Sequence, residues 1–247
     1  MSPYEIAKTD LMEAWSILHH GFKDLGLTLE RGSDFDLIDA RSLAAGAPLL
    51  EGHFSPSLNT YTPAQAFWLS LSDANGNCVG RIAARLDDLG GMCLTDFWRK
   101  YFYRCYPRAD GTQVSLADSQ PRLGQAIRGR VVYMGGCWIH EDWRSQKLGG
   151  MITQMVQIDA LEEWSPNFLY GWVQGSNFRN GFWRDCGFSR CHFEGVRWSG
   201  GLPATLDPNL IFVGNSGHDA CDLAERVVEQ RRVQSSSRTG DDTRISS

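Results

Sequence analysis

The sequence predicts a mixed α/β (α+β) fold built on one sheet. A hairpin signal spans Ala66–Leu86, where apolar and polar residues alternate on both sides of the turn at Asn75-Gly76. A strand–helix–strand–helix–strand–strand series follows from about residue 130. The chain lacks both the repeated strand–helix–strand units and the G-x-G-x-x-G pattern of a dinucleotide-binding fold. The sheet is therefore expected to be mixed and not doubly wound.

Composition excludes several classes of protein. The 247 residues are 42% hydrophobic and 21% charged, as in an ordinary globular protein. The net charge of −5 argues against a dedicated nucleic-acid binder. Apolar runs stay well short of the roughly 20 residues that span a membrane, so no membrane partner is expected. The first ten residues lack the pattern of a signal peptide, and we expect a cytoplasmic protein.

The cysteines predict neither a disulfide framework nor a metal site. There are seven, at scattered positions and without a C-x-x-C pair, which is typical of buried thiols. Cys186, Cys191 and His192 are close in sequence, but a fourth ligand at metal-site spacing does not accompany them.

The first 65 residues are expected to be a helical part of the same domain. Thr9–Phe22 places apolar residues on one face of a helix. A second short helix is expected from about residue 34 to Gly46, where glycine and Pro48 end it. The segment from there to Pro63 is rich in turn-forming residues and predicts a loop or an irregular strand.

Residues 66–213 are the expected core, with an inserted helix and loop at 87–128. The insertion carries an aromatic stripe at helical spacing between Leu94 and Cys105. Packing against the core, an acceptor pocket and a dimer face are all compatible with this stripe. Because its ends adjoin the central strands, the insertion is expected to cover the acceptor side of the site.

The second half of the core and the C-terminus are more regular. Strands are expected at 130–139 and 167–173, with a helix between them that ends near Trp164. A short helix is expected at 177–188, and two further strands follow it. A C-terminal helix is expected at 214–232, and 233–247 is expected to be a disordered polar tail.

The stretch WIHEDWRSQKLGGMI, residues 138–152, joins an expected strand to an expected helix. Its apolar start is followed by a polar loop, two glycines and an apolar series at helical spacing. A helix start has unpaired backbone N–H groups and the positive end of the helix dipole. The corner therefore predicts a site for an anion such as a phosphate.

These residues resemble the GNAT superfamily of acyl-CoA-dependent N-acyltransferases. In that family an apolar strand end and a short loop precede R/Q-x-x-G-x-G/A at a helix start, which Ile139 and Arg144–Gly149 match here. A second family element is an aromatic residue shortly before a Gly-Phe pair, matched by Trp183 and Gly187-Phe188. The resemblance covers about 66–213, and most firmly 131–188.

The resemblance implies a mostly antiparallel sheet flanked by helices, with a splayed central strand pair that holds the pantetheine arm. It also implies acetyl-CoA as co-substrate, with the pyrophosphate on the backbone N–H groups of residues 148–151. The residues that it places at the cofactor are Ile139, Arg144, Lys147, Leu148, Gly149, Gly150, Met151, Asn177 and Trp183.

Two departures from the family pattern affect the expected site. Lys147 occupies the first glycine position, and its Cβ restricts the loop. Trp183 stands where many members have a tyrosine that protonates the departing thiolate, and an indole N–H has no usable acidity. Tyr133 is the expected replacement, with Tyr170 and solvent as alternatives. Glu141 is the expected general base, although a solvated loop charge is its ordinary role.

The function expected from this resemblance is transfer of an acetyl group from acetyl-CoA to a primary amine by direct attack. One alternative is an acyltransferase that uses a longer acyl-CoA or an acyl-carrier-protein donor, as the aromatic stripe suggests. The other is an inactive CoA-binding or protein-interaction module, as Lys147 and Trp183 suggest. The expected partner is a small-molecule or peptide amine, and a homodimer is possible.

Overall fold

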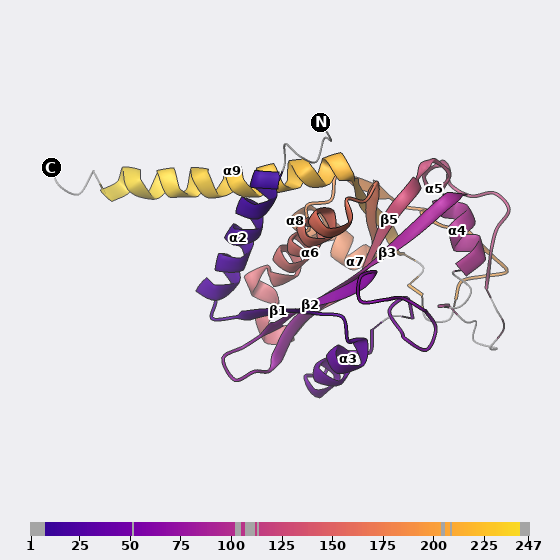
Figure 1. Ribbon diagram of the computed structural model, residues 1–247, viewed down its shortest axis with the longest axis horizontal. Helices are drawn as coiled ribbons and strands as arrows, with labels where there is room; N and C mark the ends of the chain where they lie inside the picture. Colours follow the sequence, from indigo (N-terminus) through magenta and orange to yellow (C-terminus); the bar gives the residue numbers. More distant parts are fainter. Residues whose placement is uncertain are drawn as a thin grey trace.

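The computed structural model describes residues 8–50, 52–101, 105–106, 112, 114–203, 206–207 and 209–242, with backbone alone over 234–242. A seven-stranded sheet in the order β1-β2-β3-β5-β6-β9-β7 forms its centre (Figure 1). Among the strands of the described residues, only β5 and β6 pair in parallel. The sheet strands are β1 Thr28–Gly32, β2 Ala66–Ser72, β3 Cys78–Cys93, β5 Arg128–Ile139, β6 Phe168–Val173, β7 Arg190–His192 and β9 Ile211–Ser216. A separate pair consists of β4 Ser115–Leu116 and β8 Trp198–Ser199. The expected mixed, mostly antiparallel fold is confirmed.

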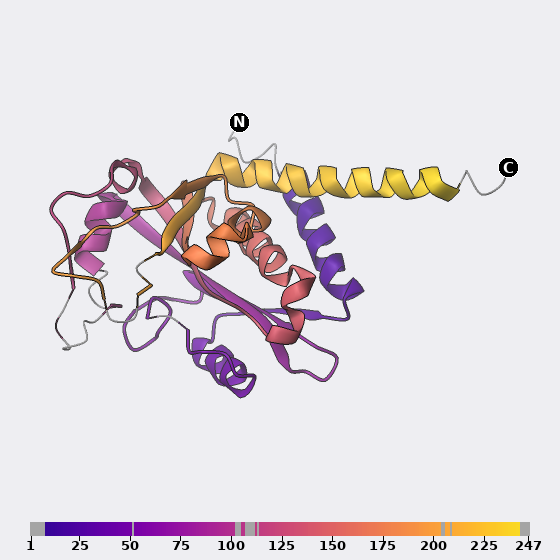
Figure 2. The same cartoon turned by 180° about the vertical axis from the view of Figure 1, so that it is seen from behind.

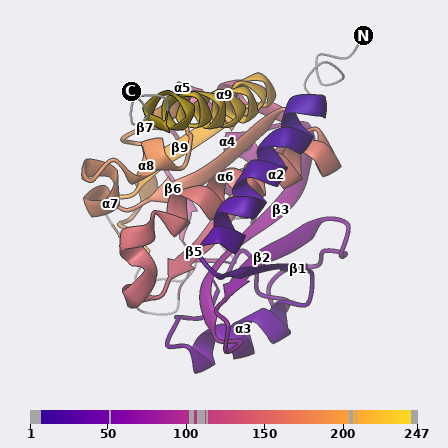
Figure 3. The same cartoon turned by 90° about the vertical axis from the view of Figure 1, so that its left-hand side faces the viewer.

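Helices cover both faces of the sheet. One apolar cluster packs α2, α6 and α9 against one face, and a second packs α3 and α4 against the other. Figure 3 shows α2 lying across the first face beside α6 and α9, which it contacts. The helices are α2 Lys8–Asp24, α3 Phe35–Ala44, α4 Leu94–Tyr101, α5 Arg122–Ala126, α6 Leu148–Trp164, α7 Gly175–Arg179, α8 Phe182–Asp185 and α9 Gly217–Asp242. Among the described helices, none combines the length and apolar composition of a membrane span.

The alternation of side chains along β2 explains how one strand contributes residues to both hydrophobic clusters. Phe67, Leu69 and Leu71 belong to the cluster under α2 and α6, whereas Trp68 belongs to the cluster on the other face. Successive side chains of a strand point to opposite faces, so the sequence pattern sets this division directly. The expected hairpin is confirmed, with β2 and β3 antiparallel.

The segment expected as an insertion is partly sheet. β3 continues to Cys93, and β5 begins at Arg128, so regular strand occupies both ends of 87–128. Phe97 and Trp98 of α4 are buried in the second cluster, which confirms core packing for that part of the aromatic stripe. Residues 102–104, in the second half of the expected helix, lie outside the described residues. The edge strand β1 was not expected.

The C-terminal helix is longer than the sequence suggested. α9 runs to Asp242, so the expected end at Arg232 and the expected disorder of 233–242 were wrong. Its first turns are anchored by buried apolar residues such as Leu223 and Val227. Once a helix is nucleated, each further residue adds a hydrogen bond, and neither glycine nor proline occurs between Gly217 and Gly240. Figure 2 shows this second half extending past the body of the protein. Residues 243–247 lie outside the described residues.

Candidate functional site

The central strand pair separates halfway along its length. β5 and β6 pair only where Val131–Tyr133 faces Phe168–Tyr170, although both strands continue further. Just beyond the paired segment, a Cβ at Gly171 would lie 2.8 Å from the carbonyl oxygen of Met134, so glycine permits this close approach. The divergence beyond it confirms the expected splayed pair.

A β-bulge in β5 shapes the open part of the splay. Arg81 pairs with Trp138, but Ala83 pairs with Gly135, so β5 carries one extra residue between these pairs. Gly136 lies in this interval at φ +64°, and a Cβ there would overlap the Leu50 side chain. Glycine is therefore required at this position both by its conformation and by its packing.

A cavity of about 540 Å³ lies between the diverging strands. Its walls include residues 133–137 of β5 and 171–173 of β6, with Thr153, Asn177 and Phe182 from the helices. The volume falls within the range of about 300–1,000 Å³ that is usual for small-molecule sites. Asp207 is the only charged side chain among the described residues that line it.

A second cavity of about 350 Å³ adjoins the first. Its described walls come mainly from residues 193–210. The two cavities share Tyr106, Trp172, Leu206, Asp207 and Leu210. The two cavities are therefore neighbours along this common wall.

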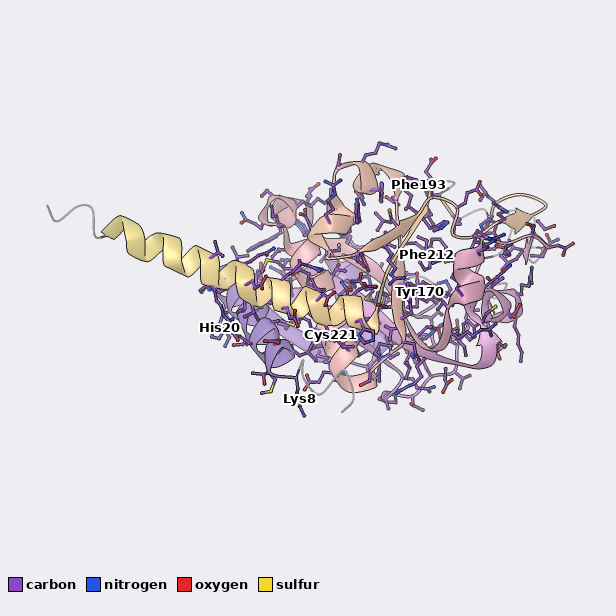
Figure 4. All side chains as sticks on the ribbon, turned by 90° about the horizontal axis from the view of Figure 1, so that it is seen from above. Lys8, His20, Tyr170, Phe193, Phe212 and Cys221 are labelled. Carbon is purple, nitrogen blue, oxygen red and sulfur yellow. The ribbon has the colours of Figure 1, made fainter. Side chains whose placement is uncertain are left out.

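Tyr133 lines the larger cavity, although its side chain is buried. Its ring is stacked on Phe54, 5.5 Å between centroids, and lies 4.5 Å from the ring of His53. Tyr170 is equally buried, and its hydroxyl accepts a hydrogen bond of 3.2 Å from Trp98 Nε1. Figure 4 shows Tyr170 beside Phe212, on which it stacks.

Burial, reinforced by the Asp87 carboxylate, raises the pKa of Tyr170 well above its ordinary value. Raising the pKa makes the phenol a weaker acid. Because Tyr170 also does not line the cavity, Tyr133 is the better placed of the two tyrosines.

A buried polar network supports the Tyr133 side of the cavity. His53 Nε2 lies 2.8 Å from the Tyr106 hydroxyl, with the donor set by the tautomer. Burial and the nearby Arg85 guanidinium hold the pKa of His53 well below its ordinary value, so the imidazole is neutral at pH 7. Arg85 is held in turn by the His53 carbonyl oxygen and by Asp87. Sequence reasoning missed His53, which stands in an irregular segment without a motif.

The loop between β5 and α6 keeps the conformation that glycine would favour. A 3₁₀-helix, η2 Glu141–Gln146, leads to Lys147, which has φ 57° and ψ 17°. Lys147 thus adopts a left-handed conformation that glycine adopts more easily. The backbone N–H groups of Gly150 and Met151 donate to the Lys147 carbonyl oxygen at 3.1 and 3.2 Å.

Two of the four expected phosphate donors are therefore already used, which corrects the expectation for Gly150 and Met151. Leu148 and Gly149 still have backbone N–H groups without a backbone acceptor among the described residues. The helix start thus retains two free donors for an anion.

Helix packing explains the two glycines that follow Leu148. A Cβ at Gly149 would lie 2.8 Å from the Phe182 ring, and a Cβ at Gly150 would lie 2.8 Å from the Asp185 carbonyl oxygen. Both glycines are buried against α8. Phe182 also lines the larger cavity, so this contact ties the start of α6 to the cavity wall. Close ligand approach is not needed to account for glycine here.

The other expected site residues are divided between the cavity and the surface. Asn177 lines the larger cavity, but Ile139, Arg144 and Lys147 do not. Arg144 Nε donates to the Ile139 carbonyl oxygen at 3.2 Å, which fastens the loop to the end of β5. Glu141 is exposed and also lies outside the cavity lining.

Trp183 does not line the cavity either. Its ring stacks on Phe178, with centroids 5.4 Å apart, and the Arg184 guanidinium lies 5.3 Å from its centroid. Trp183 therefore holds α7 against α8. Sequence reasoning missed Asp207, the carboxylate that does line the cavity, because it stands in a loop without a recognisable pattern.

The cysteines also divide between core and cavity. All seven are free, and four are buried as expected. Cys137 differs: it is exposed and lines the larger cavity, with Sγ 3.9 Å from Thr153 Oγ1. Its side chain thus provides a position from which the cavity can be filled by substitution.

No family model matches the chain. No curated protein matches it either. Several solved structures are similar in fold. Arabidopsis thaliana NAA60 in complex with acetyl-CoA is 9% identical, with a TM-score of 0.43 and coverage of 77% of this chain and 98% of that one. The spermidine/spermine N-acetyltransferase SpeG from Vibrio cholerae is 10% identical, with a TM-score of 0.43 and coverage of 80% and 97%.

A GNAT-family acetyltransferase from Staphylococcus aureus is 14% identical, with a TM-score of 0.34 and coverage of 61% of this chain and 68% of that one. All three of the proteins named above are acetyltransferases. Their identities and TM-scores are low, so the function rests on the residues of the site itself.

Proposed function

We propose that this protein is a GNAT-type N-acetyltransferase that moves an acetyl group from acetyl-CoA to a primary amine. The observation that carries the proposal is the splayed β5–β6 pair, whose cavity adjoins the start of α6 through Phe182. A long, narrow donor fits between separated strands, and its pyrophosphate fits a helix start.

The residues around α6 suit the anionic end of coenzyme A. Leu148 and Gly149 offer free backbone N–H groups, and Arg144 and Lys147 add exposed positive charge. Each hydrogen bond to a charged group contributes about 1.5–3 kcal/mol, so the backbone donors can contribute as much as either side chain. Asn177, in the cavity wall, is available to the pantetheine arm.

Transfer then proceeds by direct attack. The amine attacks as the neutral species, after its ammonium form has lost a proton to solvent. Its nitrogen bonds to the thioester carbonyl carbon, the C–S bond breaks, the thiolate leaves with the electron pair, and the surplus proton on the amide nitrogen also passes to solvent. Tyr133, which lines the cavity, is our proposed donor of a proton to that thiolate. This direct transfer forms no covalent enzyme intermediate.

The structure bears differently on the two alternatives. The aromatic stripe that suggested a longer acyl donor is, at Phe97 and Trp98, part of the core. The non-catalytic alternative drew on Trp183, which lies outside the cavity lining, so its identity does not decide whether transfer occurs. If acetyl-CoA binds but no amine tested causes release of the thiol, the non-catalytic module is favoured.

Filling the cavity tests the proposal. Cys137→Trp places a large ring between the strands from an exposed position, so the core is left intact. Calorimetry should show acetyl-CoA affinity reduced by about tenfold or more, because the added ring takes the volume of the donor. Arg226→Trp, on an exposed position of α9, is the matched control and should bind like the parent. Equal affinity in both variants, each with a parental melting temperature, would place the donor elsewhere.

A further inference from the structure

We propose that the acceptor is a primary amine on a short arm from an aromatic ring. Its ring occupies the second cavity and its ammonium group lies against Asp207. This inference rests on the proposed function and specifies the acceptor of the same site. It follows from the walls of the second cavity, from the charges around it and from its junction with the larger cavity.

The walls of the second cavity are largely aromatic and aliphatic. Tyr106, Trp172, Phe193 and Trp198 contribute rings, and three leucines contribute apolar surface. The rings of Tyr106 and Trp198 meet edge to face, with centroids 5.7 Å apart and planes at 78°. Rings in this arrangement favour a flat aromatic guest over a flexible chain of amines. Phe193, labelled in Figure 4, has 69% of its surface exposed, which is high for an aromatic residue in a pocket wall.

The charges of the second cavity leave one carboxylate available. Glu194 and Arg197 both line it, but they pair with each other at 2.9 Å. Asp207 Oδ1 accepts from the Asn209 backbone N–H at 2.8 Å, which fixes the carboxylate in a turn. Its other oxygen has no hydrogen-bond partner among the described residues. Asp207 is therefore a positioned negative charge that is not in an ion pair among the described residues, which suits an ammonium group.

The common wall also contains an unsatisfied donor. Trp172 Nε1 is buried and has no hydrogen-bond partner among the described residues. Trp172 lines both cavities, as Asp207 does. Buried donors are normally paired, so this indole N–H is an unusual feature of the common wall. An amine held at Asp207 lies at the junction, where it can reach a thioester in the larger cavity.

A comparison of acceptors tests the chemical class. Tryptamine and 2-phenylethylamine are compared with hexylamine and spermidine by the release of thiol at saturating acetyl-CoA. We expect kcat/KM for the aryl amines to exceed that for hexylamine by about tenfold or more, because only the ring gains the aromatic contacts. Equal or higher values for hexylamine or spermidine would overturn the proposal.

Two substitutions locate the binding groups. Asp207→Asn keeps the shape and removes the charge, so KM for tryptamine should rise by about tenfold or more while acetyl-CoA affinity stays at the parental value. Phe193→Ala, at an exposed rim, should raise KM for tryptamine and leave KM for hexylamine unchanged. Asp222→Asn, an exposed carboxylate on α9 outside both cavities, is the matched control. An unchanged KM for tryptamine in Asp207→Asn would refute the role of the carboxylate.

Separate binding measurements distinguish this inference from the proposed function. Acetyl-CoA binding is followed by calorimetry, and amine binding by a separate calorimetric titration without acetyl-CoA. If acetyl-CoA binds but the amines show no preference for a ring, only the acceptor inference fails. If acetyl-CoA does not bind, the proposed function fails, and tryptamine binding that depends on Asp207 would still support an aryl-amine site.

Discussion

Replacing Lys147 by glycine should stabilise the protein. Lys147 has φ 57° and ψ 17°, the left-handed conformation that a side chain disfavours. That conformation costs a non-glycine residue about 1–2 kcal/mol. Glycine loses more backbone entropy on folding, which offsets about 0.5–1 kcal/mol of the gain. We therefore expect the free energy of unfolding to rise by about 0.5–1 kcal/mol. For a chain of this length, that corresponds to a rise in Tm of roughly 1–4 °C.

Lys147→Ala is the matched control, because alanine keeps the Cβ and so keeps the backbone strain. The glycine and alanine variants both lose the ammonium group, and they should lose the same modest share of acetyl-CoA affinity. Urea denaturation measures the stability and calorimetry measures the binding. If the glycine variant is no more stable than the alanine variant, the left-handed conformation of Lys147 is not strained in solution and the reasoning is refuted.

Three further predictions concern acid chemistry and pH. Tyr133→Phe should lower turnover by about ten- to a thousandfold and leave acetyl-CoA affinity unchanged. The rate of thiol release measures turnover, and calorimetry measures affinity. Unchanged turnover would show that Tyr133 is not the acid. Trp183→Tyr should not raise turnover, because that side chain stacks on Phe178 outside the cavity; a gain would show that position 183 reaches the thiolate. Burial raises the pKa of Asp159 to about 6, and the Arg31 guanidinium opposes that rise only in part. Repulsion from the neighbouring glutamates adds a smaller increase. The folded state then binds more protons than the unfolded state between about pH 4 and pH 6, so stability falls as pH rises through that window. Asp159→Asn should therefore stabilise the protein at pH 8 and have little effect at pH 4, and thermal unfolding at the two pH values measures this. An equal effect at both pH values would contradict the prediction.

The local pattern of the sequence determined the elements that flank the site. Alternation in β2 set which residues face each core, because the period of a strand is two whatever the strand pairs with. The strand–loop–helix corner at 138–152 was readable for the same reason: its apolar ends and its loop are contiguous in the chain. The sequence also singled out Tyr133 and Asn177, which line the larger cavity, since each lies in or beside an element that the pattern defines.

Local pattern was less informative about the loop itself. It marked Lys147 as a departure from glycine, yet only the backbone shows that the left-handed conformation is kept. Gly149 and Gly150 looked like openings for a ligand, whereas Phe182 and Asp185 of a different helix occupy that space. The contacts that decide these positions are made by residues more than thirty positions away in the chain.

The cavities themselves were decided by tertiary structure. The splay of β5 from β6 depends on where the two strands stop pairing. The alternation of apolar and polar residues in either strand does not indicate that point. Asp207 and His53 come from irregular segments, and they reach the site only because the sheet brings distant loops to its open end. A pocket is a relation among residues far apart in sequence, and the spacing of residues along a chain carries information only about those near one another. The acceptor class is therefore inferred from the folded walls and not from a motif.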